Sequence, residues 1–190
     1  MDLKGIRVFL DLDGVVSDFS LAMCQTMGLN HLSTTLRDRL ENNYMVSNEV
    51  CAETFWNKVT SEGTDWWANI PLTPWAHNLY NGLSNVAPVC FLTAPHDNDP
   101  LSLAGKAMWI KKHFKTDCFL VGKRKEFCAS PKAVLIDDYI RNVQRFVEAG
   151  GLAYHWPNPD KLRNEGNWEQ EIDKVVGFVK EAVRGNVIHV

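Results

Sequence analysis

The sequence predicts an α/β fold in which a parallel sheet has helices on both faces, in three layers, with a small helical cap inserted after the first strand. Three observations support this prediction. Short apolar runs recur along the chain, helical patterns lie between them, and one interval between two runs is far too long for a single crossover helix. Continuous apolar strands that alternate with helices are typical of a parallel sheet covered on both faces.

The expected strands are short apolar runs bounded by turn-forming or polar residues. They are IRVFLDL, PVCFLTA, DCFLVG, AVLIDD and GLAYHW, at residues 6–12, 88–94, 117–122, 133–138 and 151–156. Each run has the length of an ordinary strand and is apolar almost throughout, as strands in the interior of a parallel sheet are.

Helical patterns fill intervals between these runs. Between residues 139 and 150 the apolar side chains recur at helical spacing, and Gly150 and Gly151 supply a natural stop. Residues 74–86 are expected to form a helix with Pro74 in its first turn. The last helix has an apolar stripe made of Ile172, Val175, Val176, Val179 and Val183.

The interval between Asp13 and Val89 contains about 75 residues, whereas a β-strand, its crossover helix and the next strand need about 30. That interval must therefore hold an insertion. We assign residues 1–18 and 73–190 to the core and residues 19–72 to a small helical cap. The cap contains the polar helical stretch TTLRDRLENN and the tryptophan-rich stretch FWNKVTSEGTDWWANIPLTPW.

The composition is that of an ordinary globular protein, with 45% hydrophobic and 23% charged residues. A formal net charge of -3 gives no positive field for a nucleic acid polymer. The sequence has no apolar run of membrane-spanning length, no signal-type N-terminus and no CxxC pair. We therefore expect a soluble, cytoplasmic protein with reduced thiols, without a zinc site and without membrane or nucleic acid partners.

Polar side chains follow the expected strands where ligands bind in parallel sheets. Asp11 and Asp13 follow the first run, Thr93 ends the second, and Asp137 and Asp138 end the fourth. The carboxyl ends of parallel strands meet at one edge of the sheet. Carboxylates that lie close together stay ionised only when a cation balances them, and Mg²⁺ prefers oxygen ligands. The pattern predicts a Mg²⁺ site that handles a small phosphate.

Four motifs in order, DLDGVVSD, LTAP, a lysine before the fourth strand and LIDD, resemble those of the haloacid dehalogenase-like phosphatases. The similarity covers a Rossmann-like core from Ile6 to about Trp156, and the cap by position. Within that superfamily, the DLDGVVSDF start, the aromatic cap residues, LTAP and LIDDYIRNVQRFVEAGG look most like the 5'(3')-deoxyribonucleotidases and their bacterial and phage relatives. The resemblance implies Mg²⁺-dependent hydrolysis of (deoxy)ribonucleoside monophosphates.

The resemblance also implies a role for each site residue. Asp11 would attack phosphorus and form an aspartyl-phosphate, and Asp13 would serve first as acid and then as base. Mg²⁺ would be held by Asp11, the main-chain carbonyl of Asp13, and Asp138 or Asp137. The phosphate oxygens would be held by Thr93, Ala94 and Lys125. Substrate contacts would come from Phe55, Trp56, Trp66, Trp67 and His96.

Ordinary structural explanations compete with several of these roles. Asp138 could cap the helix that follows it, and Thr93 could be a buried core residue. Asp18 is expected to cap the first cap helix. Because Trp66 and Trp67 are adjacent, their side chains would point about 100° apart on a helix, so at least one is expected in the core.

The role of the lysine and the choice of substrate stay open. Lys123, Arg124 and Lys132 lie close enough in the sequence to compete with Lys125 for the phosphate. The same chemistry could serve a sugar phosphate or another small phosphomonoester. A phosphoacceptor signalling module also clusters Asp, Thr and Lys around Mg²⁺, but it places its aspartate on the third strand. A binding protein without catalysis, and a homodimer, are further alternatives.

Overall fold

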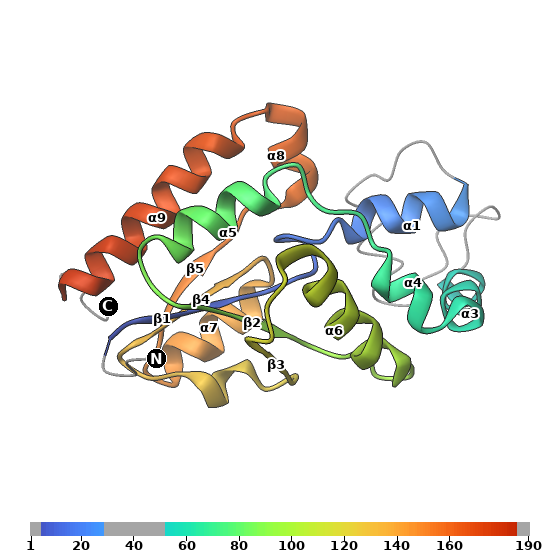
Figure 1. Ribbon diagram of the computed structural model, residues 1–190, viewed down its shortest axis with the longest axis horizontal. Helices are drawn as coiled ribbons and strands as arrows, with labels where there is room; N and C mark the ends of the chain where they lie inside the picture. The colour runs from blue at the N-terminus through green and yellow to red at the C-terminus, as the bar shows by residue number, and fades with distance from the viewer. Residues whose placement is uncertain (1–4, 29–51, 186–190) are drawn as a thin grey trace.

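The computed structural model describes residues 5–28 and 52–185 (Figure 1). The strands are β1 (Arg7–Leu10), β2 (Val89–Thr93), β3 (Phe119–Val121), β4 (Ala133–Asp137) and β5 (Leu152–His155). The helices are α1 (Phe19–Met27), α3 (Ala52–Glu62), α4 (Thr64–Ala68), α5 (Ala76–Ser84), α6 (Leu101–Phe114), α7 (Ile140–Glu148), α8 (Pro159–Glu165) and α9 (Trp168–Arg184), with a 3-10 turn, η1 (Lys125–Cys128). Each strand lies within the apolar run that predicted it. Within the described part of the chain, no helix is long and apolar enough to cross a membrane.

The strands of the described residues form one parallel sheet in the order β3-β2-β1-β4-β5. Strand β1 is therefore central, with Leu10 opposite Phe91 of β2 on one side and Ile136 of β4 on the other. Because all strands point the same way, the carboxyl ends of β1, β2 and β4 lie side by side. The topology thus gathers Asp11, Thr93 and the Asp137 pair, which are far apart in the sequence.

Alternate residues of β1 enter two different cores. Val8 and Leu10 belong to the larger core, to which α5 and α9 contribute, whereas Phe9 packs edge-on against Phe146 of α7 on the opposite face. Figure 1 shows α5 and α9 together on one side of the sheet and α7 on the other. The predicted three-layer α/β fold is confirmed.

Helix α7 ends at the glycine pair that the sequence indicated. Gly150 follows the C-cap residue Ala149 with a φ of +86°, a conformation that glycine adopts without strain. A Cβ atom on Gly151 would lie 2.4 Å from the ring of Phe146, so the chain passes directly against this core residue. The two glycines therefore serve different purposes, one for the turn and one for the packing.

The predicted cap, residues 19–72, contains α1, α3 and α4 in its described part. Figure 1 shows these three helices together at one end of the molecule. The expected polar helix TTLRDRLENN lies outside the described residues. That residues 19–72 act as a separate cap stays a prediction.

The chain enters and leaves this inserted segment at one place. The N–H of Asp18 donates to the carbonyl of Pro71 at 2.7 Å, and the N–H of Thr73 donates to the carbonyl of Val16 at 2.9 Å. The Asp18 carboxylate also accepts a hydrogen bond from the N–H of Leu21, so it caps α1 as the sequence indicated. The two connections are thereby joined at the edge of the core.

Candidate active site

An acidic cluster, defined here as Asp11, Asp137 and Asp138, lies at the carboxyl ends of β1 and β4. Asp11 follows β1 and its N–H donates to the carbonyl of Ile136 at 3.0 Å, which holds it beside β4. One carboxylate oxygen from each of the three acids lies within 4.8 Å of the other two. The cluster supplies only oxygen ligands and concentrates negative charge, so these residues fit a hard divalent cation such as Mg²⁺.

Lys125 balances two acids of the cluster. Its Nζ lies 2.6 Å from Asp11 Oδ1 and 2.7 Å from Asp137 Oδ2, and all three side chains are buried. Burial alone would lower the pKa of Lys125, but the two carboxylates outweigh it and hold that pKa above its usual value. Burial raises the pKa of Asp11 to about 8, against the opposing charge of Lys125. A divalent cation at the cluster would favour the ionised form of Asp11.

The two acids of the LIDD motif have different surroundings. The fully buried Asp137 accepts hydrogen bonds from Lys125, from the Asn142 amide at 3.0 and 3.1 Å, and from the N–H of Tyr139 at 2.9 Å. Tyr139 is the N-cap residue of α7, and this helix start has no side-chain cap hydrogen bond, so the capping role considered for Asp138 is not observed. Both oxygens of Asp137 are therefore already engaged by protein donors.

Asp138 lies directly against the turn after β1. A Cβ atom on Gly14 would lie 2.0 Å from Asp138 Oδ2, and Gly14 has a φ of +80°. Only glycine satisfies both conditions, because a side chain there would be strained and would collide with the carboxylate. The glycine of the DLDG motif thus leaves the space that lets Asp138 approach the β1 end.

Asp13 is bound by a lysine of its own. Lys106 Nζ donates to Asp13 Oδ2 at 2.5 Å, and Ser17 Oγ donates to Oδ1 at 2.8 Å. Burial pushes the pKa of Asp13 up, but the Lys106 charge and these hydrogen bonds outweigh it and hold the pKa below its usual value. The sequence analysis expected a shared cation to keep Asp11 and Asp13 ionised together. The structure instead pairs each carboxylate with a separate buried lysine.

The sequence analysis did not identify Lys106. This side chain comes from α6 and also donates to the Ala94 carbonyl at 2.7 Å and to Thr93 Oγ1 at 3.4 Å. The signal that could have identified Lys106 is its helical spacing, because Lys106 lies on the stripe of α6 that faces the interior. That stripe consists of Ser102, Gly105, Lys106, Trp109 and Ile110. A lysine on a buried helix face needs a carboxylate partner, so this spacing would have indicated that Lys106 pairs with an acid.

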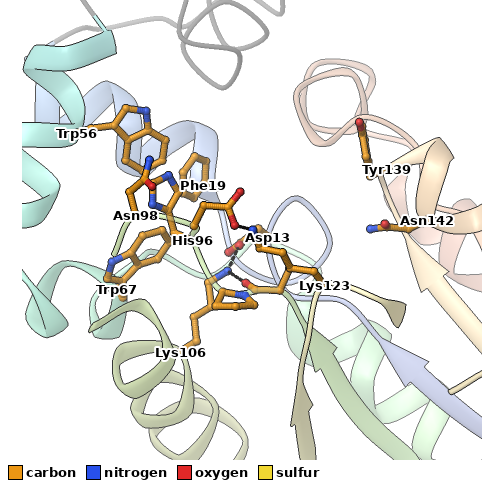
Figure 2. Close-up of a pocket in the computed structure, with 13 residues that line it drawn as sticks. Asp13, Phe19, Trp56, Trp67, His96, Asn98, Lys106, Lys123, Tyr139 and Asn142 are labelled. Atoms are coloured by element: carbon orange, nitrogen blue, oxygen red, sulfur yellow. Dashed lines mark hydrogen bonds and ion pairs between the residues drawn. The ribbon is translucent and has the colours of Figure 1, made fainter. Parts of the chain in front are cut away.

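A cavity of about 460 Å³ opens beside Asp13 and Lys106 (Figure 2). Its lining residues are Asp13, Phe19, Trp56, Trp67, Ala94, Pro95, His96, Asp97, Asn98, Lys106, Lys123, Tyr139 and Asn142. Figure 2 shows the rings of Phe19, Trp56, Trp67 and His96 gathered on one side, and Tyr139 and Asn142 on the other. The acids of the cluster do not line the cavity, but its lining residue Asn142 donates to Asp137, which connects the two by a hydrogen bond.

The aromatic wall of the cavity is defined here as Phe19, Trp56, Trp67 and His96. The ring of Trp56 stacks on His96 with centroids 4.0 Å apart and planes inclined by 28°. Burial holds the pKa of His96 below its usual value, so this ring is neutral at neutral pH. Trp67 donates its indole N–H to Asp99 at 2.7 Å and lies under Lys106, with Nζ 5.1 Å from its ring centroid.

Two of the expected substrate residues do not line this cavity. Phe55 is fully buried in the larger core. Trp66 donates its indole N–H to Thr26 Oγ1 at 2.7 Å and borders a separate hollow. Trp66 and Trp67 point apart, as adjacent helical residues must, and Trp67 is the one that reaches the cavity. Phe19, which the sequence analysis did not single out, lines the cavity in their place.

The structure separates the lysines that the sequence analysis left open. Lys125 enters the acidic cluster, whereas Lys123 lies at the cavity rim and pairs with Asp97. Arg124 is directed to Glu126, with the two charged groups 2.5 Å apart. Lys125 therefore contacts the expected nucleophile Asp11 directly, and Lys132 is exposed.

Solved structures with a similar arrangement are haloacid dehalogenase-like hydrolases. One from Xanthomonas campestris is 12% identical with a TM-score of 0.51, over 91% of this chain and 94% of that chain. One from Streptococcus pneumoniae is 17% identical with a TM-score of 0.50, over 78% and 83% of the two chains. A magnesium-bound one from Bacillus subtilis is 13% identical with a TM-score of 0.50, over 78% and 85%.

This chain has the haloacid dehalogenase-like fold. No protein-family model matches its sequence, and no curated protein matches it. The predicted resemblance is therefore confirmed at the level of the fold, and the resemblance to deoxyribonucleotidases stays a prediction.

Proposed function

We propose that this chain is a Mg²⁺-dependent phosphatase that hydrolyses (deoxy)ribonucleoside monophosphates through an aspartyl-phosphate on Asp11. The observation that carries the proposal is the meeting of Asp11, Asp138 and Lys125 at the carboxyl ends of the central strands. A nucleophilic carboxylate, oxygen ligands for a metal and a buried cation are the groups that phosphoryl transfer uses. The solved hydrolase of similar fold from Bacillus subtilis was crystallised with magnesium, which is consistent with the proposed choice of metal.

Asp11 and Asp138 are the acids best placed to hold Mg²⁺. Asp137 completes the cluster, but Lys125, Asn142 and the Tyr139 N–H already occupy its oxygens. Asp137 would therefore orient Lys125 and support the other two acids. When bound, Mg²⁺ supplies positive charge that offsets the negative charge of the phosphate oxygens.

The reaction divides into two displacements at phosphorus. A carboxylate oxygen of Asp11 forms a bond to phosphorus while the bond to the leaving oxygen breaks. Asp13, which has first taken up a proton from solvent against the charge of Lys106, delivers that proton to the leaving oxygen. Asp13 then removes a proton from water as the water oxygen attacks phosphorus. The bond to Asp11 breaks, which releases phosphate and restores the carboxylate.

Two buried lysines and the end of β2 surround the expected position of the phosphate. Lys125 contacts Asp11, and Lys106 lies between Asp13, Thr93 and the Ala94 carbonyl. Both cations lie where negative charge develops on the transferring group. We assign phosphate binding to Thr93, Ala94 and Lys125, as the sequence indicated, and we add Lys106.

The aromatic wall favours a substrate with a planar leaving group. Trp56 and Trp67 come from α3 and α4, and Phe19 from α1, so the inserted helices supply most of this wall. This origin supports the assignment of residues 19–72 to a cap over the site. A nucleoside offers a flat base to such rings, and stacking is worth about 1–3 kcal/mol per base. A sugar phosphate offers no comparable surface.

Substitution of the nucleophile tests the chemistry. Asp11→Asn should abolish Mg²⁺-dependent phosphate release from dUMP and dTMP, because an amide is a poor nucleophile and a poor metal ligand. Removing Mg²⁺ with EDTA should abolish the activity of the unaltered protein. Asp117→Asn is the matched control, because Asp117 is an exposed acid that pairs with Lys111 on the surface. An Asp11→Asn variant that keeps most of the activity would refute the aspartyl-phosphate mechanism.

A substrate panel tests the leaving group separately. Deoxynucleoside and ribonucleoside monophosphates should be hydrolysed with a higher kcat/KM than ribose 5-phosphate or glucose 6-phosphate, all measured below saturation. The reverse order would leave the phosphatase assignment intact and overturn the nucleotide assignment.

A further inference from the structure

A group of thiols lies on the sheet away from the site described above. Cys90 is in β2, Cys118 immediately precedes the edge strand β3, and Cys128 ends η1. Each is partly buried, and Cys90 and Cys128 pack against the smaller core on the α7 face of the sheet. No step of the proposed phosphatase reaction uses any of them.

The strand register makes Cys90 and Cys118 direct neighbours. Phe91 pairs with Phe119, and the N–H of Phe91 donates to the Cys118 carbonyl at 3.0 Å. One residue earlier, Cys90 therefore lies opposite Cys118, and side chains opposite one another leave a sheet on the same face. The Cys90 thiol donates to the carbonyl of Phe91 at 3.5 Å, and the thiols of Cys118 and Cys128 are close enough to raise the pKa of Cys90.

The spacing of adjacent strands suits a covalent link between these two residues. Neighbouring strands lie about 4.7–4.9 Å apart, and the Cα atoms of disulfide-bonded cysteines lie about 4.4–6.8 Å apart. Because the two side chains leave the same face of the sheet, rotation about their side-chain bonds and a small approach of the two Cβ atoms would bring the sulfur atoms to bonding distance.

The coverage of the sheet leaves these thiols within reach of small molecules. The connection from β3 to β4 spans residues 122–132, all of which are described, and it contains only the short turn η1. In that connection no helix crosses the α7 face above β2 and β3. The side chain of Leu120, in β3, is accordingly 47% exposed.

We propose that Cys90 and Cys118 form a reversible disulfide bond with a soluble low-molecular-weight disulfide as the oxidant. One protein thiolate attacks a sulfur of the small disulfide, which forms a mixed disulfide and releases one small thiolate. The second protein thiolate attacks the protein sulfur of the mixed disulfide and releases the other small thiolate. The two protein thiols lose two protons and two electrons, and the small disulfide becomes two thiols.

The local environment makes this reaction slow at neutral pH. Burial, together with the neighbouring Cys118 thiol, raises the pKa of Cys90 to about 12. Because the thiolate is the attacking species, the rate of disulfide formation should rise about tenfold per pH unit between neutral and mildly alkaline solution. The pair should thus stay reduced under reducing conditions and react when oxidant is abundant.

Peptide mapping of the full chain tests the proposal. The protein is incubated with oxidised glutathione in mildly alkaline buffer, its free thiols are blocked with iodoacetamide, and it is digested without reduction. A cross-linked peptide pair that joins Cys90 to Cys118 is expected, with a mass about 2 Da below the sum of its reduced parts, and dithiothreitol should separate it. Cys24, which is buried in α1 and alone there, should remain a free thiol.

Two variants and a second reagent sharpen the test. Cys128→Ser should retain the link, whereas Cys118→Ser should lose it. Phenylarsine oxide, which bridges two neighbouring thiols, should consume one equivalent and protect Cys90 and Cys118 from alkylation in the unoxidised protein. A link that joins Cys128 to either partner, or full alkylation of both cysteines after each treatment, would overturn the proposal. These readouts do not depend on phosphatase activity.

Discussion

The acidic cluster and the aromatic wall lie at the same end of the sheet, yet they are held in different ways. In the cluster, Lys125 contacts Asp11 and Asp137 at 2.6 and 2.7 Å, and all three side chains are buried. In the wall, Trp56 and His96 meet ring to ring and stay partly exposed. Charged hydrogen bonds depend steeply on distance and direction, whereas ring contacts tolerate displacement. The comparison indicates rigid positioning for the chemistry and adaptable packing for substrate choice.

The largest effect is expected from removing the cation of the acidic cluster. Lys125→Met should lower kcat by about 100-fold to 1000-fold, because a preorganised positive charge at the reacting group is lost. The free energy of unfolding of this variant should also be about 3–5 kcal/mol lower than that of the unaltered protein, because two buried carboxylates lose their partner. Mg²⁺ should raise its Tm more than that of the unaltered protein. Lys112→Met is the control for activity assays and thermal melts, because Lys112 is exposed and donates to the Asn69 amide oxygen on the surface.

A smaller loss is expected at the second buried lysine. Lys106→Met should lower kcat by about tenfold to 100-fold, because Asp13 loses its charged partner beside Thr93. Its cost in stability should be below that of Lys125→Met, since the Asp13 side chain is 28% exposed and water can replace part of the interaction. Lys111→Met on the same helix is the control, because Lys111 is exposed and pairs with Asp117. Equal kcat values for Lys106→Met and Lys111→Met would exclude Lys106 from the reaction.

The aromatic wall should respond selectively. Trp56→Ala should lower kcat/KM for nucleoside monophosphates by about fivefold to 150-fold, which corresponds to one lost stacking contact of about 1–3 kcal/mol. The kcat/KM for ribose 5-phosphate should change by less than about twofold, because that substrate has no base to stack. Trp56→Phe should recover most of the nucleotide activity. An equal loss for both substrates would mean that Trp56 supports the site and does not select the substrate.

The smallest effect is expected in a polar cluster outside both regions. Tyr154 donates to Glu171 at 2.6 Å, and Lys174 donates to the same carboxylate at 2.9 Å. Burial pushes the pKa of Glu171 up, but these two bonds outweigh it and lower that pKa from its ordinary value of 4.5. Tyr154→Phe should therefore lower the free energy of unfolding by about 1 kcal/mol at pH values above 4.5.

The pH dependence of that difference has a definite sign. A carboxyl whose pKa is lower in the folded state stabilises the fold above its unfolded pKa, and the contribution disappears as the pH falls through the folded value. The free energies of unfolding of Tyr154→Phe and of the unaltered protein, measured in urea, should therefore converge as the pH falls from 4.5 through the folded-state pKa of Glu171. A difference that grew in acid would contradict the assigned interaction.

The sequence predicted the sheet well because all of its strands are short and apolar, and β1 and β4 at its centre are buried almost throughout. All five runs became strands, and the residues that end β1, β2 and β4 meet as the parallel topology requires. Asp11, Thr93 and Asp138 could be named because each directly follows or ends a strand, and Asp13 because it lies in the turn after β1. Their positions depend on where each strand ends, and the end of an apolar run in the sequence predicts that point.

The sequence was less informative where tertiary packing decides the direction of a side chain. Lys106 is brought to Asp13 by the way α6 packs, and the surrounding sequence has no motif that names it. Phe55 and Trp56 are adjacent aromatic residues, but one enters the core and the other lines the cavity. Composition alone cannot separate such neighbours, because the choice depends on which face of α3 meets the rest of the molecule.

The joined entrance and exit of the inserted segment have a consequence for how this molecule can diversify. Since Asp18 and Thr73 are hydrogen-bonded to residues of the opposite connection, the segment between them leaves the core and returns to it at the same place. Its length and sequence can change without altering the register of any strand. Changes within the segment can therefore alter the aromatic wall while Asp11, Asp137 and Lys125 keep their places at the strand ends.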